Sequence, residues 1–385
     1  MLQRPRTVYT EDHEIFRASV RRFVEAELVP HHDAWEEAGI VPRDAWRKAG
    51  EAGLLCCDIA EEYGGPGGDF GHCAVVTEEI ARANLSGPGF VVHSDMVATY
   101  VAKFGSEAQK KAWLPGMVDG SRIAAIAMTE PDAGSDLKGM RTRADRDGDE
   151  YVITGQKTYI SNGQNAHMAI VACKTDPSAG AHGISLIAVE TDRPGFRPGR
   201  NLKKLGMHAQ DTSELFFDGV RVPVTNRLGS EGQGFGMLMT NLARERLVQA
   251  VRGTVIAEQV IQWTVRHTRD RKAFGKTIAD FQNTRFVVAE LAAKIAAARA
   301  LTDRLIALQL EGTLDPIEAG MAKLFVTDLQ WETCDRCLQL FGGAGYMTEY
   351  PIARAWADSR VTRIAGGAAE VMKEIIGRRI FSDVQ

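Results

Sequence analysis

The feature that most constrains the fold is a hydrophobic period that changes twice along the chain. Residues 1–120 repeat apolar side chains at the three- and four-residue steps of a helix, beginning after the capping residue Thr10. Residues 121–228 hold short β-branched or aromatic runs separated by Gly, Pro, Asp and Asn. Residues 229–385 return to the helical period. We therefore predict an α+β protein with an N-terminal helical domain, a middle β domain and a C-terminal helical domain, divided at these positions.

The strand runs of the middle stretch are predicted at residues 151–154, 168–173, 183–189 and 214–217. Their connections are too short for crossover helices, which favours a β-sandwich or barrel over a doubly wound parallel sheet. In the last stretch two long helical faces predict a four-helix bundle. The first face comprises Phe286, Val287, Leu291, Ile295 and Ala298, and the second Ala319, Leu324, Leu329, Cys334 and Leu338.

Charge and cysteine content exclude several classes of protein. The 46 basic and 50 acidic residues give a net charge of −4 without a basic stripe, so we expect no nucleic-acid partner. No run approaches the roughly 18 apolar residues of a membrane span, so no stable membrane insertion is expected. The beginning of the chain carries no visible secretory signal. Six sparse cysteines predict no disulfide framework and fit a reducing, cytoplasmic location.

Common catalytic motifs are missing, including the P-loop, H-E-x-x-H and G-x-S-x-G. The pair Cys334 and Cys337 has no second pair of ligands, so we predict a structural role and no metal site. Residues 127–139 stand out, since they combine two hydroxyls, two glycines and three carboxylates ahead of the strands. Such a segment suits either a capped turn or a loop that holds a pyrophosphate, and its composition leaves both open.

Four segments, in order, resemble motifs of the acyl-CoA dehydrogenase family. Residues 127–139 resemble its first signature, and residues 157–163 its turn over the flavin. Residues 271–276, with Phe281 and Gln282, are similar to a segment that reaches a neighbouring subunit's FAD, and residues 339–346 resemble the second signature. The resemblance implies an FAD enzyme that oxidises a fatty acyl-CoA to the trans-2-enoyl-CoA, as in fatty acid β-oxidation. It also implies a homotetramer, or at least a dimer, and an electron-transferring flavoprotein as acceptor.

The resemblance also places the catalytic base. Many members carry a glutamate in a turn near the C-terminus, but the matching position here is Gly366. Long-chain and isovaleryl-type members carry the base on an earlier helix, and that pattern matches residues 242–247 and selects Glu245. Three alternatives stay open: Glu245 as a surface residue between two arginines, Glu370 as the base, and a member with no functional base.

Other roles follow residue by residue from the same resemblance. The residues that would line the flavin are Ile126, Met128, Thr129, Gly134, Ser135, Tyr159, Ile160 and Ser161, with Ala368 and Glu370 from the C-terminal segment. Those that would bind a partner subunit's FAD are Arg271, Phe274, Gln282, Gln339, Leu340, Gly342 and Gly343. Those that would touch the acyl-CoA are Ser135, Leu242, Arg246, Gly366 and Gly367, the Gly366 N–H facing the thioester oxygen. For Arg246 a plain ion pair, and for Gln339 a turn cap, are the structural alternatives.

Two further functions fit the same fold. Relatives include acyl-CoA oxidases and N-hydroxylating monooxygenases, in which reduced flavin reacts with oxygen. A non-catalytic member whose bundle only binds partners is the other alternative. The dehydrogenase of a medium- or long-chain acyl-CoA is the function that we predict, although Ala368, Ala369 and Gly236 depart from common family residues and leave flavin affinity and chain length undetermined.

Overall fold

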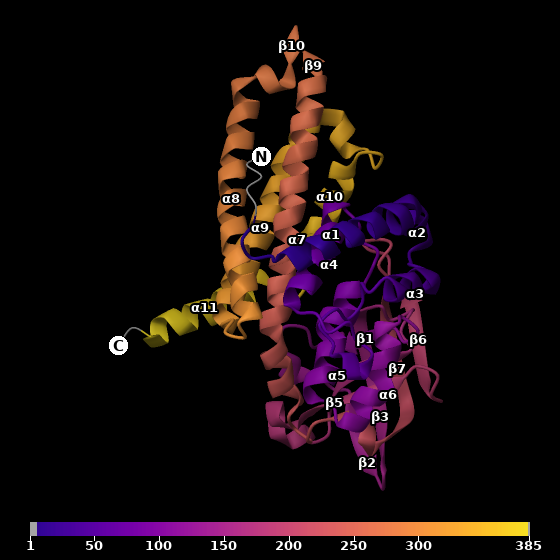
Figure 1. Ribbon diagram of the computed structural model, residues 1–385. Coiled ribbons are helices and arrows are strands. Elements are labelled where there is room, and N and C mark those ends of the chain that lie inside the picture. Colours follow the sequence, from indigo (N-terminus) through magenta and orange to yellow (C-terminus); the bar gives the residue numbers. More distant parts are fainter. Residues whose placement is uncertain (1–5, 384–385) are drawn as a thin grey trace.

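The computed structural model describes residues 6–383 and shows two helical regions around a β region (Figure 1). The long C-terminal helices run along one side of the molecule. The sheet, with α5 and α6, lies beside their lower part in the view of Figure 1. The predicted α+β class, with helical, β and helical parts in this order, is confirmed. Over residues 6–383, no helix combines the length and the apolar character that crossing a bilayer would require.

The N-terminal helices follow the predicted periodicity. They are α1 (Glu11–Phe23), α2 (His32–Ala38), α3 (Arg43–Glu51), α4 (Phe70–Arg82), α5 (Thr99–Phe104) and α6 (Glu107–Val118). The Thr10 side chain accepts the backbone N–H of His13 and so caps α1, as predicted. A π-helical segment, η4 (Val92–Ala98), leads directly into α5.

One mixed sheet forms the middle of the chain. Its strands are β1 (Ala124–Ala127), β2 (Arg143–Asp147), β3 (Glu150–Ser161), β4 (Met168–Lys174), β5 (Ile184–Glu190), β6 (Phe196–Asn201), β7 (Thr212–Pro223) and β8 (Arg227–Leu228). The order is β6-β7-β3-β2-β4-β5-β8, with β1 beside β4. Pairing is antiparallel except where β4 meets β1 and β2. The four predicted strands are present, whereas β1, β2, β6 and the two-residue β8 were not predicted; β2 and β6 are largely polar and exposed.

The C-terminal helices are α7 (Gly234–Asp270), α8 (Gln282–Leu310), α9 (Pro316–Phe341), α10 (Pro351–Ser359) and α11 (Ala369–Asp383). A small hairpin of β9 (Lys272–Ala273) and β10 (Lys276–Thr277) joins α7 to α8 at the tip of the molecule. Leu291, Ile295 and Ala298 are buried as predicted. Phe286, predicted on the same face, is 63% exposed, because it lies near the start of α8, close to that tip.

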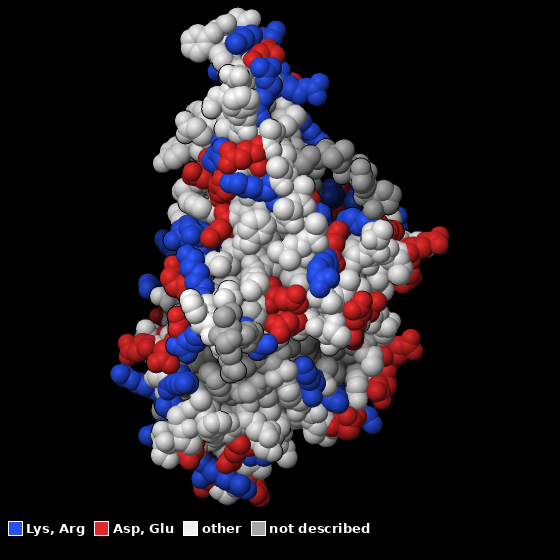
Figure 2. Space-filling view, turned by 90° about the vertical axis from the view of Figure 1, so that its left-hand side faces the viewer, with Lys and Arg blue, Asp and Glu red and all other residues white. Residues whose placement is uncertain are grey.

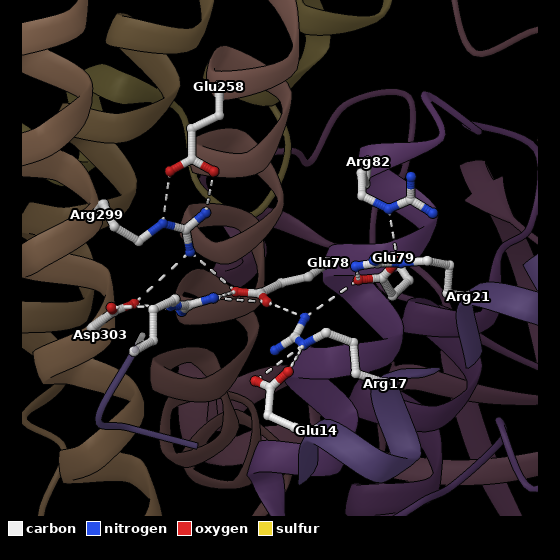
Figure 3. Close-up of polar contacts among 10 residues, drawn as sticks. Glu14, Arg17, Arg21, Glu78, Glu79, Arg82, Glu258, Arg299 and Asp303 are labelled. Atoms are coloured by element: carbon white, nitrogen blue, oxygen red, sulfur yellow. Dashed lines mark hydrogen bonds and ion pairs between the residues drawn. The ribbon is translucent and has the colours of Figure 1, made fainter. Parts of the chain in front are cut away.

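Buried ion pairs join the N-terminal helices to the bundle (Figure 3). Glu78 and Glu79 on α4 are almost completely buried. Glu78 binds Arg6 at 2.6 Å, Arg17 at 2.7 Å and Arg299 of α8 at 3.1 Å. The surrounding arginines hold the pKa of both glutamates below the ordinary value despite burial. This network therefore fixes α1 and α4 against α8.

Candidate active site

A buried glutamate lies in the middle of the long helix α7. Glu245 is 3% exposed, so the alternative of a surface residue is wrong. Its Oε1 accepts the hydroxyl of Tyr100 on α5 at 3.0 Å and the Asn241 amide at 3.4 Å. The Asn241 amide also donates to the Thr99 hydroxyl at 2.9 Å. The carboxylate is thus held in one orientation by side chains from two helices.

Burial sets the proton affinity of this carboxyl group. Desolvation raises the pKa of Glu245, and the hydrogen bonds from Tyr100 and Asn241, together with the charge of Arg246, oppose that shift only in part. The other neighbouring arginine, Arg244, forms ion pairs with Asp58 and Asp95 and is engaged elsewhere. A carboxylate with a raised pKa in a water-poor setting is suited to act as a general base.

The C-terminal glycine pair lies against the same face of α7. Gly366 and Gly367 have φ of +66° and +97°, a region that favours glycine. A Cβ on Gly366 would stand 1.9 Å from the Gln249 amide nitrogen, and Gln249 lies one turn after Glu245. Among the hydrogen bonds of residues 6–383, none engages the Gly366 N–H. This donor is therefore available to a ligand near Glu245.

Two segments predicted to line the flavin are held together in the sheet. The Thr158 N–H donates to the Thr129 carbonyl at 2.9 Å. The buried Lys157 ammonium donates to the Met128 carbonyl at 3.0 Å and pairs with Glu130 at 2.8 Å. Residues 126–130 and 157–161 consequently form one wall.

Tyr159 has an unusual backbone on that wall. Its φ is +59°, and the β3–β7 register shifts between Lys157 and Ile160, which marks a β-bulge. The bulge leaves the tyrosine ring 69% exposed. A non-glycine residue in this conformation is costly and is often kept for function, in agreement with a ring that would cover a flat ligand.

His93 connects this wall to the helix that contacts Glu245. Its Nδ1 accepts the Ala124 N–H of β1 at 3.1 Å, and its Nε2 donates to the Met117 carbonyl at 2.8 Å. Burial lowers the pKa of His93 to about 4, so the ring is neutral and can accept the first of these bonds. His93 belongs to η4, which continues into the helix of Tyr100, so β1 and Glu245 share one framework.

A second group of predicted FAD residues lies at the other end of the molecule. Arg271, Phe274 and Gln282 are exposed around the β9–β10 tip, far along α7 from the sheet (Figure 1). The His267 ring stacks on Phe341 at 4.2 Å, which brings residues 339–343 close to this end of α7. Figure 2 shows Lys and Arg gathered at the tip, and acidic and basic residues interspersed below it. Within a single chain the two groups of predicted FAD residues are thus far apart, as expected if the tip binds the FAD of another subunit.

Both groups are accessible to a large ligand such as FAD. A Cβ built on Gly134, Gly342 or Gly343 would meet no atom within 4 Å. A ligand can therefore approach the backbone of both segments, as a pyrophosphate requires. The basic tip residues would supply positive charge for that pyrophosphate.

The remaining predicted residues fall into two environments. Leu242 and Arg246 flank Glu245 on α7; Arg246 is 7% exposed and donates to the Pro316 carbonyl at 3.4 Å. Ser135 is exposed in its loop, Ala368 is half-buried, and Glu370 is exposed at the start of α11. The exposure of Glu370 contrasts with the burial that raises the pKa of Glu245, which disfavours Glu370 as the base.

A cluster of metal-type ligands in the N-terminal helices has another use. The ligand atoms of His13, Asp69 and His72 lie within 4.8 Å of one another. Asp69 and His72 cap the start of α4, and the Thr10 and His13 pair caps α1. These side chains already bind backbone N–H groups at the starts of the two helices, and helix capping accounts for their proximity. All six cysteines are free and buried.

Three family models cover the chain in order. Residues 10–121 match the acyl-CoA dehydrogenase N-terminal domain, residues 125–220 the middle domain and residues 232–381 the C-terminal domain. The chain belongs to the acyl-CoA dehydrogenase family. This acyl-CoA dehydrogenase is 47% identical to the mitochondrial long-chain specific acyl-CoA dehydrogenase of Sus scrofa over 380 residues, which cover 98% of this chain and 88% of the relative.

Solved structures agree with this assignment. An acyl-CoA dehydrogenase from Geobacillus kaustophilus matches with a TM-score of 0.96 and 46% identity, covering 98% of this chain and 100% of that one. A glutaryl-CoA dehydrogenase from Mycobacterium smegmatis in complex with FADH2 matches with a TM-score of 0.91 and 28% identity, covering 97% and 96%. The protein is accordingly an FAD-binding oxidoreductase that dehydrogenates acyl-CoA.

Several residues around the site were not predicted. Tyr100, Asn241 and Gln249 contact Glu245 or Gly366, and Lys157 and Lys323 are buried cations next to predicted segments. Only Lys157 carried a usable signal, since it begins the segment 157–163 that resembles the family's turn over the flavin. The others depend on contacts between distant helices.

Proposed function

We propose that this acyl-CoA dehydrogenase converts a medium- or long-chain fatty acyl-CoA to the trans-2-enoyl-CoA, with Glu245 as the base that removes the α-proton. The observation that carries the proposal is the buried Glu245 carboxylate, with its raised pKa, beside the Gly366 loop. FAD, when bound, accepts the hydride that leaves the β-carbon.

Each residue near the base has a defined task in this proposal. Tyr100 and Asn241 orient the carboxylate towards the α-carbon. The Gly366 N–H donates to the thioester oxygen, which gathers negative charge as the α-proton leaves. Ser135, Leu242, Arg246 and Gly367 contact the acyl-CoA. Because the site is buried, water is excluded and the charge on that oxygen is stabilised by fixed donors.

The flavin contacts are proposed in two sets. The ring and the adjoining pyrophosphate lie on Ile126, Met128, Thr129, Gly134, Ser135, Tyr159, Ile160 and Ser161, with Ala368 and Glu370 nearby. The tip residues Arg271, Phe274, Gln282, Gln339, Leu340, Gly342 and Gly343 bind the FAD of a neighbouring chain. The separation of the two sets within one chain supports this division.

Flavin sites shared between chains require at least a dimer, and we propose a homotetramer. Exposed apolar residues support it: Phe274 at the tip is 94% exposed, and Phe381 on the projecting helix α11 is 85% exposed. We propose an electron-transferring flavoprotein as acceptor and a cytoplasmic location, the latter supported by the six free, buried cysteines.

An anaerobic titration with saturated acyl-CoAs of increasing chain length tests the proposal. Flavin absorbance should bleach, most readily with medium or long chains, and Glu245→Gln should keep FAD and acyl-CoA binding but lose nearly all bleaching. Glu374→Gln, which changes an exposed glutamate of α11 paired with Arg378, is the matched control and should bleach at nearly the parent rate. Parent-like bleaching by Glu245→Gln would refute the base, and rapid reoxidation of the reduced enzyme by air would favour an oxidase.

A further inference from the structure

A buried lysine holds the glycine pair near the base. Lys323 on α9 has no exposed surface, and its ammonium donates to the Gly367 carbonyl at 2.6 Å. Among the described residues, no carboxylate oxygen lies within 4.0 Å of this nitrogen. Burying a cation without a paired anion is costly. This lysine is therefore expected to serve a purpose other than stability.

The charges around Lys323 come from four elements. Burial, together with repulsion from Arg246 of α7 and Arg363 after α10, lowers its pKa to about 8. Asp328 of α9 and Glu370 of α11 act in the opposite direction. The lysine thus stays protonated at neutral pH, with the Gly367 carbonyl as the partner that the structure gives to its ammonium.

The loop that it holds needs an anchor. Gly366 and Gly367 both adopt positive φ, and a glycine backbone resists rotation less than any other. On one side, Gln249 touches Gly366, and on the other, Met372 lies against Gly367. These contacts limit the volume open to the loop, whereas the hydrogen bond from Lys323 to the Gly367 carbonyl fixes the direction of a peptide group.

We propose that Lys323 is a positioning residue: its bond to the Gly367 carbonyl fixes the peptide group that follows Gly367 and so restrains the torsions of the glycine pair, which keeps the Gly366 N–H directed at the thioester oxygen of the bound acyl-CoA. The inference rests on the proposed function, because it assigns the Gly366 N–H the task given above. Lys323 itself touches neither the substrate nor the flavin in this proposal. It acts through the backbone that it holds.

The test compares Lys323→Met, which keeps the volume of the side chain and removes the donor, with Lys110→Met, an ion-paired lysine of α6. An enoyl-CoA labelled with ¹³C at the thioester carbonyl is bound to each holoenzyme, and the carbonyl stretch is measured by infrared difference spectroscopy. A well-aimed donor weakens the C=O bond. Lys323→Met should therefore shift the band to higher wavenumber and slow flavin reduction by roughly tenfold or more, and Lys110→Met should do neither.

Separate outcomes test the two proposals. If the parent enzyme is not reduced by any acyl-CoA, the proposed function fails. If the parent is reduced and Lys323→Met matches it in band position and rate, the positioning role is wrong. If Lys323→Met loses FAD or its native circular dichroism, the parent band is followed from pH 7 to 9. A shift to higher wavenumber with a midpoint near 8 is expected, because the neutral amine of Lys323 is a weaker hydrogen-bond donor than its ammonium, and a band that does not move overturns the proposal.

Discussion

The Tyr100 hydroxyl donates to the Glu245 carboxylate at 3.0 Å, and both side chains are buried. The bond joins residues that are 145 positions apart, from the helix after η4 and from the middle of α7. It stabilises the ionised glutamate, whereas burial stabilises the protonated form. The pKa of Glu245 therefore depends on this contact.

Tyr100→Phe should move the acid limb of flavin reduction to higher pH. Removing the Tyr100 hydroxyl removes a hydrogen bond that favours the ionised carboxylate. The pKa of Glu245 therefore rises, and the carboxyl group is ionised only at higher pH. A hydrogen bond to a charged group corresponds to a shift of about one pH unit. The measurement is the rate of anaerobic flavin reduction against pH, and an unmoved limb would show that Tyr100 does not set the pKa.

Moving the base to position 366 should fail while Gln249 is present. Gly366→Glu in an E245Q background places a Cβ 1.9 Å from the Gln249 amide, in a backbone region unfavourable to any side chain. The double variant should remain inactive, and adding Gln249→Ala should raise its reduction rate by about tenfold or more. Activity in the double variant without the third change would contradict the steric argument.

Glu78→Gln should destabilise the fold strongly. The change leaves Arg6, Arg17 and Arg299 facing one another without their shared buried anion, at a cost of about 3–5 kcal/mol. Because the folded-state pKa of Glu78 is lowered, its contribution is present above the ordinary pKa of 4.5 and is lost as pH falls through the lower folded value.

Chemical denaturation at pH 7 and at lower pH measures this effect. Glu14→Gln is the control, since Glu14 pairs with Arg17 but is 53% exposed and should contribute less than about 1 kcal/mol. Equal midpoints for the two variants at pH 7 would show that the buried network adds no more than a surface pair.

Lys157→Met should weaken FAD binding by about tenfold or more, because it strands Glu130 in the interior and releases the Met128 carbonyl. Combining it with Glu130→Gln should recover part of the loss. Titration of the apoprotein with FAD gives the dissociation constants. Lys138→Met is the control, because Lys138 is exposed in the segment 127–139 that also contains Met128 and Glu130. If the double variant binds more weakly than Lys157→Met, the stranded charge is not the cause.

Periodicity was sufficient for the order of the domains but not for the environment of the site. The apolar faces of α8 and α9 and the β-branched runs predicted the elements, because burial acts on local patterns. Tyr100, Asn241 and Gln249 reach the site through helix packing, which no local pattern records. Lysines are usually solvated, so Lys157 and Lys323 could not be placed inside from their type alone.

The length of α7 has a consequence for inheritance. The helix has 37 residues, and Glu245 and Arg271 are 26 residues apart, about 39 Å at the α-helical rise. One helix therefore carries the proposed base of its own active site and, in the proposed assembly, a cofactor contact of a neighbour's active site. A chain damaged at the tip would impair its neighbour and spare itself. Two alleles that are each inactive, one altered at Glu245 and one at Arg271, would then complement each other when co-expressed.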